Sequence, residues 1–139
     1  KLFSKVDVVP VSLILAVVAV ESVRGTSRFA LEANNIFGRH AVSGCKKCVK
    51  AQGSNTYLIK YDTLSEAIDD QLRYLNRHWN YPELRDLRLD MRQDGLNLVG
   101  ALLSPGLENY SERKMEYVLS LNRMMTMETA WYKYDALAL

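Results

Sequence analysis

A nearly unbroken apolar run from residue 11 to residue 20 constrains this chain more than any other feature, and the charged residue Glu21 follows it directly. Pro10 suits the first position of a helix, and Gly25 lies beyond the run as a stop signal. We therefore predict a helix that is apolar on nearly all sides and buried in the core. A helix of about twelve residues spans roughly 18 Å, which is too short to cross a bilayer.

Glu21 is predicted to lie at the carboxyl end of this helix. Partial burial favours the protonated form of a carboxyl group, and the helix dipole disfavours negative charge at this end. Both effects are expected to raise its pKa, which would suit it to act as a general acid. The alternative is an ordinary exposed glutamate at a helix end, and the chemistry of the residue alone leaves both open.

Length and composition limit the classes of protein. The chain has 139 residues, of which 48% are hydrophobic, so we expect residues 1–139 to form a single domain with one core. The net charge of +2 is mild, and no basic cluster interleaved with aromatic residues indicates a nucleic-acid partner. No signal peptide or initiating methionine is present, so we interpret the sequence as a mature or trimmed fragment that lacks an upstream segment.

The remaining pattern predicts helices interrupted by one irregular stretch. Thr26 or Ser27 can cap a short helix that the Asn34-Asn35 pair ends. Residues 36–61 combine three glycines with a strand-forming run at 57–61, which indicates a β-hairpin. Further helices are predicted from the capping box at residues 63–66, from Pro82 to Met91, over residues 96–103, and after a Ser111 cap with Met115, Val118, Leu119, Leu121 and Met125 facing inward. The predicted fold class is α+β, mostly helical, with a small β-hairpin lobe.

Several segments together carry a resemblance to a known family. They are Ala19-Val20-Glu21-Ser22, residues 8–12 and 25–38, residues 61–68, 75–78 and 80–85, and Tyr110 to Arg113 with Tyr117. In order and spacing these segments resemble the bacterial glucosaminidases, glycoside hydrolase family 73, and within them the Bax-type branch. The resemblance covers nearly the whole chain. It implies a lysozyme-like fold, cleavage of β-1,4 bonds after N-acetylglucosamine in peptidoglycan, and an exported, periplasmic or envelope protein. We expect no cofactor and no metal.

The resemblance also implies roles for individual residues. Glu21 falls on the general acid of the family, and Tyr110 falls on the tyrosine that helps to shape the catalytic centre. For Tyr110 the alternative is a core tyrosine with a satisfied hydroxyl group. Weaker candidates for substrate binding are Tyr81, Asn35, Phe37 and Tyr61.

The chain departs from the family pattern next to the acid and in the hairpin. Val23 stands where the family usually has glycine, and Arg24 stands where it has tryptophan; a cation so close can lower the pKa of Glu21. No Asp or Glu occurs from Ala33 to Tyr61, so the hairpin supplies no second carboxylate. This absence favours substrate-assisted hydrolysis, in which the acetamido group of the substrate is the nucleophile. It leaves two alternatives open, a wall-binding module without turnover and a lytic transglycosylase.

The hairpin region contains two further patterns. Its cations Arg39, His40, Lys46, Lys47, Lys50 and Lys60 could attract the carboxylates of peptidoglycan, or could form a solvated loop without a binding role. Cys45 and Cys48 are too few for a structural zinc site, although His40 and His78 could be recruited to one. In an exported protein we expect a disulfide between these cysteines, with free thiols as the alternative.

Overall fold

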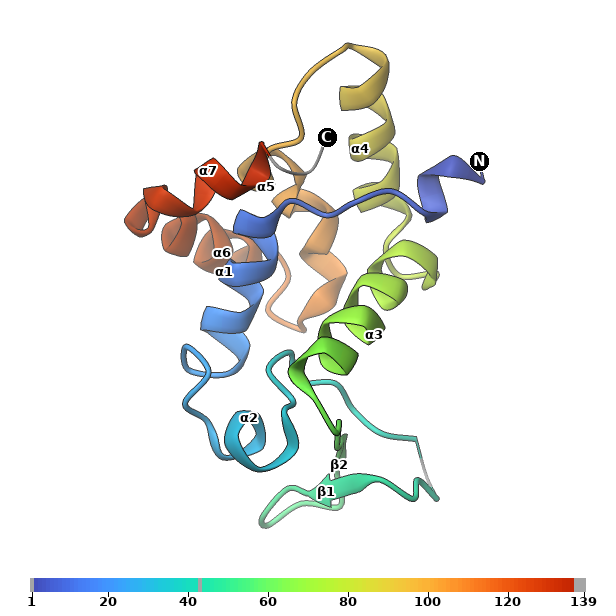
Figure 1. Ribbon diagram of the computed structural model, residues 1–139, viewed down its shortest axis with the longest axis vertical. Coiled ribbons are helices and arrows are strands. Elements are labelled where there is room, and N and C mark those ends of the chain that lie inside the picture. Colours follow the sequence, from blue (N-terminus) through green and yellow to red (C-terminus); the bar gives the residue numbers. More distant parts are fainter. Residues whose placement is uncertain (1, 43, 137–139) are drawn as a thin grey trace. The chain divides into compact units, whose positions relative to one another are not determined.

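The computed structural model describes residues 2–42 and 44–136, and the chain divides into two compact units. The first, here called the helical unit, comprises Lys1–Val17 and Leu72–Leu139. The second, the hairpin unit, comprises Val18–Gln71. Figure 1 shows the helices and the two-stranded sheet, coloured in chain order.

The described residues form a mostly helical α+β structure, which confirms the predicted fold class. The elements in chain order are η1 (Phe3–Lys5), α1 (Val11–Glu21), α2 (Arg28–Ala33), β1 (Cys48–Lys50), β2 (Tyr57–Ile59), α3 (Leu64–Arg77), α4 (Pro82–Gln93), α5 (Gly100–Leu103), η2 (Ser104–Tyr110), α6 (Met115–Met127), η3 (Thr129–Trp131) and α7 (Tyr132–Asp135).

The core of the helical unit forms around the short helix η2. Helices α4 and α6 both pack against it, and Leu84, Leu107 and Leu121 from the three elements are fully buried. Gly106 of η2 lies so close to α4 that a methyl group on it would overlap the backbone of Leu84. Only glycine permits this approach, so the sequence Ser104-Pro105-Gly106 fixes where the two helices meet.

Asp135 anchors the first turn of α1 within the helical unit. Its carboxylate accepts hydrogen bonds from the amide and the hydroxyl of Ser12, at 2.8 and 2.6 Å, and from the amide of Gly100 at 3.2 Å. Asp135 and Ser12 are both buried. A carboxylate is well placed at a helix N-terminus, because it satisfies free amide groups and interacts favourably with the helix dipole.

The turn that follows α1 contains three consecutive residues with positive φ. The hydroxyl of Ser22 donates to the carbonyl of Val18 at 2.5 Å and accepts from the amide of Gly25 at 2.9 Å. Between them Val23 and Arg24 have φ values of 51° and 55°, and Gly25 has 82°. A β-branched residue in this region is strained, and the valine side chain gains little in return because it is 66% exposed.

The hairpin unit contains the short helix α2 and the antiparallel pair β1 and β2. The side chain of Ser27 caps α2 by accepting from the amide of Ala30, and Asn34 ends the helix in the left-handed conformation. Cys48 faces Ile59, Val49 faces Leu58 and Lys50 faces Tyr57 across the hairpin. The strand predicted over residues 57–61 ends at Ile59, because the amide of Tyr61 donates instead to the carbonyl of Ala33.

Three predictions about later helices are wrong. Ser111 does not cap the last long helix: Lys114 is the residue before α6, and the Ser111 hydroxyl accepts only from the amide of Arg113, inside the preceding turn. Met115 and Leu119 are 48% and 56% exposed instead of buried, whereas Val118, Leu121 and Met125 are buried as predicted. The helix predicted over residues 96–103 forms only from Gly100.

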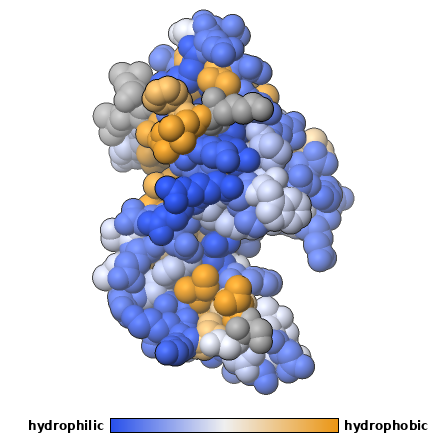
Figure 2. Space-filling model, turned by 90° about the vertical axis from the view of Figure 1, so that its right-hand side faces the viewer, coloured by the Kyte–Doolittle hydropathy of each residue, from blue (hydrophilic) through white to orange (hydrophobic). Residues whose placement is uncertain are grey.

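No helix within residues 2–42 and 44–136 is long and apolar enough to cross a membrane. On the face shown in Figure 2, apolar residues form separate groups within a largely hydrophilic surface. Helix α1 is the most apolar segment, and its residues Leu13, Ala16 and Val17 are fully buried.

Replacement of Asp135 by alanine should lower the free energy of unfolding by about 3 kcal/mol, because buried donors on Ser12 and Gly100 would lose a charged acceptor. Urea denaturation of the variant measures this change. Asp86→Ala is the matched control: this aspartate is exposed on α4, and its loss should change the stability by less than about 0.5 kcal/mol. Equal effects of the two replacements would contradict the anchoring role of Asp135.

Replacement of Val23 by glycine should raise the free energy of unfolding by about 1 kcal/mol, because it removes the strain of a β-branched residue at positive φ. Val6 is the control, since it is also exposed, at 63%, but has a φ of −136°. Val6→Gly should leave the stability unchanged or lower it, by up to about 1 kcal/mol. A loss of stability in Val23→Gly, measured by the same urea titration, would show that the turn is not strained.

Candidate active site

Glu21 is the last residue of α1, and its carboxylate lies against the backbone of Gly38 in the hairpin unit. The glutamate side chain is partly exposed. A methyl group built on Gly38 would lie 3.2 Å from Oε2 of Glu21, and Gly38 itself has a φ of +69°. A larger residue would therefore be strained and would press on the carboxylate, so the loop at Gly38 forms one wall of the acid's environment.

Asn35 holds this loop in place. Its side-chain amide donates to the carbonyls of Arg39 and Ile59, at 2.9 and 2.8 Å, and its side-chain oxygen accepts from the amide of Arg39 at 2.9 Å. The residue is only 2% exposed. These three bonds close the chain around Gly38 and tie it to strand β2, so the position of Gly38 depends on Asn35.

Phe37, within the same loop, is 1% exposed and belongs to the core. Neither Asn35 nor Phe37 presents a surface on which a sugar could lie. The sequence placed both among the substrate-binding candidates; in the structure both are buried within the loop beside Glu21.

Tyr61 and Asp70 form a polar pair at the end of the hairpin. The hydroxyl of Tyr61 donates to Oδ2 of Asp70 at 2.5 Å, and Nε of Arg39 donates to the same oxygen at 3.3 Å. Burial and the bond to Asp70 raise the pKa of the Tyr61 hydroxyl, so it stays protonated. Tyr61 is 8% exposed and serves here to join the hairpin to α3.

Asp70 and Gly38 are the two residues of this region that the sequence analysis missed. Asp70 lies on α3 outside any motif, and only the fold brings it to Arg39 and Tyr61. Asp62, the first carboxylate after the hairpin, is paired with Lys47 at 2.6 Å. Both aspartates are therefore engaged by cations of the hairpin. Because residue 38 is a glycine, the sequence is compatible with a positive φ there, but nothing in the sequence indicates that Gly38 contacts Glu21.

Tyr110 and Tyr81 belong to the helical unit, in which they are part of a cluster of aromatic rings. The ring of Tyr110 is stacked on that of Tyr117, with centroids 5.5 Å apart and planes at 7°, and lies 6.0 Å from Tyr81. Tyr81 is 2% exposed, and its hydroxyl donates to that of Tyr74 at 3.3 Å. Tyr110 is partly exposed, so of the two only Tyr110 offers substantial surface to a ligand.

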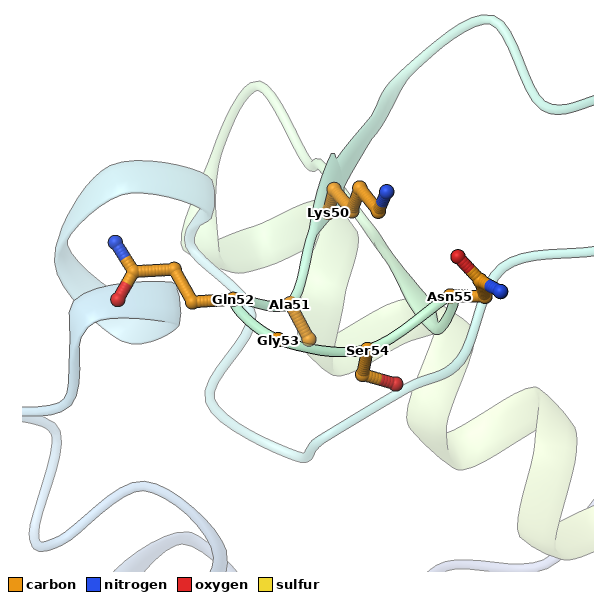
Figure 3. A pocket seen from close by; sticks show the side chains of 6 residues that line it. All are labelled: Lys50, Ala51, Gln52, Gly53, Ser54 and Asn55. Carbon is orange, nitrogen blue, oxygen red and sulfur yellow. The ribbon is translucent and has the colours of Figure 1, made fainter.

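The hairpin presents a basic surface with a shallow hollow at its tip. Arg39 and Lys47 are paired with aspartates, whereas Lys46, Lys50 and Lys60 are exposed and have no ion pair among the residues that the structure describes. Residues 50–55 line the hollow. In Figure 3 the side chains of Lys50 and Asn55 extend to the same side of the loop, and Gln52 points the opposite way.

Cys45 and Cys48 form a disulfide at the start of β1, which confirms that prediction. Among residues 2–42 and 44–136, no group of three or more histidine, cysteine or acidic side chains is arranged to hold a metal ion.

Comparison of the sequence with known proteins identifies the family of this chain. The sequence model of the glucosaminidases, described as mannosyl-glycoprotein endo-β-N-acetylglucosaminidase, matches residues 1–136. Protein bax of Escherichia coli (strain K12) is 28% identical over 116 residues, which are 84% of this chain and 42% of that protein. The chain thus spans less than half of the length of this relative. No solved structure gives a significant match. Because the family model matches almost the whole chain, this chain belongs to the glucosaminidase family of glycoside hydrolases.

Proposed function

We propose that this chain is an endo-β-N-acetylglucosaminidase that cleaves β-1,4 bonds after N-acetylglucosamine in the glycan strands of peptidoglycan, with Glu21 as the general acid. The family match over residues 1–136 supports the class of reaction. The observation that carries the residue assignment is the carboxylate of Glu21, held at the end of a buried helix and against the backbone of Gly38. The family also supports an exported protein of the cell envelope.

The proposed reaction needs one protein carboxyl group. Glu21 gives its proton to the leaving glycosidic oxygen while the acetamido oxygen of the substrate attacks C1, so that the old C1–O bond breaks and an oxazolinium ring forms. Water then opens this ring, and Glu21 takes back a proton from that water. Two contacts of the hairpin support this route. Asp62 forms an ion pair with Lys47, and Asp70 forms an ion pair with Arg39 and accepts a hydrogen bond from Tyr61. Both aspartates are thus bound to cations of the hairpin.

Tyr110 is the second residue of the proposed mechanism. Its ring contacts those of Tyr81 and Tyr117, which limits the freedom of the phenol to turn. A fixed hydroxyl group can orient the acetamido group or the water for attack. Tyr81 supports Tyr110 from the core, and the three exposed lysines of the hairpin favour the approach of the negatively charged wall polymer.

Glu21→Gln should reduce the cleavage of purified peptidoglycan by about a hundredfold or more, because the amide cannot donate the proton that the leaving oxygen needs. The rate is measured from new chain ends, which mass spectrometry identifies. Glu32→Gln is the control, since Glu32 is exposed on α2 and forms an ion pair with Arg28. Unchanged turnover in Glu21→Gln would refute the assignment of the acid.

The identity of the new ends separates the proposal from its alternatives. Reducing N-acetylglucosamine ends support hydrolysis. Anhydromuramic ends would show a lytic transglycosylase, in which no water enters the product. Binding to peptidoglycan without new ends would show a wall-binding module, the alternative that the replaced residues Val23 and Arg24 favour.

Gly38→Ala should lower kcat by about tenfold or more, because the added methyl group displaces the carboxylate of Glu21 from its working position. Gly53→Ala is a closely matched control: Gly53 has the same φ of +69°, but nothing lies within 4 Å of its added methyl group. Both variants should lose a similar amount of stability in urea. Equal kcat values for the two variants would show that the contact with Gly38 does not position the acid.

A further inference from the structure

A row of aromatic rings in the helical unit runs from Tyr110 to an exposed tryptophan. Tyr110 lies 6.0 Å from Tyr81, Tyr81 lies 5.9 Å from His78, and His78 lies 5.3 Å from Trp79, measured between ring centroids. Trp79 is 79% exposed although it is the largest apolar side chain of the row. The row thus begins at a residue of the proposed active site and ends at the surface.

His78 gives Trp79 a fixed support. Its Nδ1 accepts from the amide of Asn80 at 3.2 Å, its carbonyl accepts from the guanidinium of Arg85 at 2.9 Å, and its ring lies 4.6 Å from that of Tyr74. The planes of His78 and Trp79 are nearly parallel, at 29°. An indole stacked in this way is held flat before any ligand arrives, which reduces the entropy lost on binding.

We propose that Trp79 is a stacking platform for a sugar ring of the glycan strand, at a subsite separate from the one beside Tyr110 of the same unit. This inference rests on the proposed function, since that function supplies a long β-1,4-linked substrate. One face of a pyranose ring carries only C–H groups and matches the flat apolar surface of an indole. Tyr110 and Trp79 are linked through the rings of Tyr81 and His78, so the proposed platform and Tyr110 belong to one packed aromatic cluster of the helical unit.

The chain makes a direct binding test simple, because it has only two tryptophans, Trp79 and Trp131. In a Glu21→Gln, Trp131→Phe background all indole fluorescence comes from Trp79 and turnover is suppressed. Peptide-free glycan strands prepared from peptidoglycan should change this fluorescence in a saturable way, whereas N-acetylglucosamine alone should not. No change at strand concentrations that saturate binding in a sedimentation assay would overturn the proposal.

A kinetic test separates a distal platform from a structural role. With Glu21 intact, Trp79→Ala should raise KM for long peptide-free strands about tenfold, the equivalent of one aromatic stacking contact, and change kcat less than twofold. Trp79→Tyr should restore most of the affinity, and a tetrasaccharide substrate should be cleaved alike by all forms. A fall in kcat on both substrates, or a normal KM in Trp79→Ala, would refute the inference.

The two tests also distinguish failure of this inference from failure of the proposed function. If no form of the protein cleaves peptidoglycan, the proposed function fails, while the fluorescence titration in the Glu21→Gln background still decides whether Trp79 binds glycan. If the native chain is a dimer that Trp79→Ala dissociates, the exposed indole is an interface with a second copy and the inference is wrong.

Discussion

The carboxylate of Asp135 is the interaction on which much of the helical unit depends. It joins the first turn of α1 to the first turn of α5 from a position near the other end of the chain, by three hydrogen bonds to Ser12 and Gly100. Helix α1 is apolar over most of its surface, so burial alone would hold it equally well in many rotations about its axis. Directed bonds from a buried carboxylate select one of them, because unsatisfied amide groups in the core are costly.

The other end of α1 carries the proposed acid, and here the chain combines a fixed environment with local strain. Asn35 holds the loop at Gly38 with three hydrogen bonds, and this loop lies against the carboxylate of Glu21. Immediately after Glu21, Val23 and Arg24 adopt positive φ values without being glycine. Strain of this kind persists only where neighbouring contacts enforce it, as the bonds of Ser22 to Val18 and Gly25 do.

The tyrosines of the chain illustrate how burial changes a functional interpretation. Tyr61 and Tyr81 are nearly inaccessible and use their hydroxyl groups within the protein, on Asp70 and Tyr74. Tyr110 is partly exposed and contacts two other tyrosine rings. The same residue type therefore fills structural, supporting and proposed catalytic roles, and only the surroundings of each ring distinguish them.

The sequence by itself determined the elements whose signals are local. The apolar run ending at Glu21, the proline that begins α4 and the glycine-rich hairpin each specify a start or a stop through neighbouring residues. For the cap of α2 the sequence offered Thr26 or Ser27, and the structure has Ser27. It failed where the signal was ambiguous, as at Ser111, whose hydroxyl serves a turn and not a cap. The tertiary structure alone decided the partners of Asp135, the network of Arg39, Tyr61 and Asp70, and the contact between Gly38 and Glu21. These contacts join residues far apart in the chain, so no local sequence pattern indicates them. They determine which polar groups are bound within the protein and which remain available to a substrate.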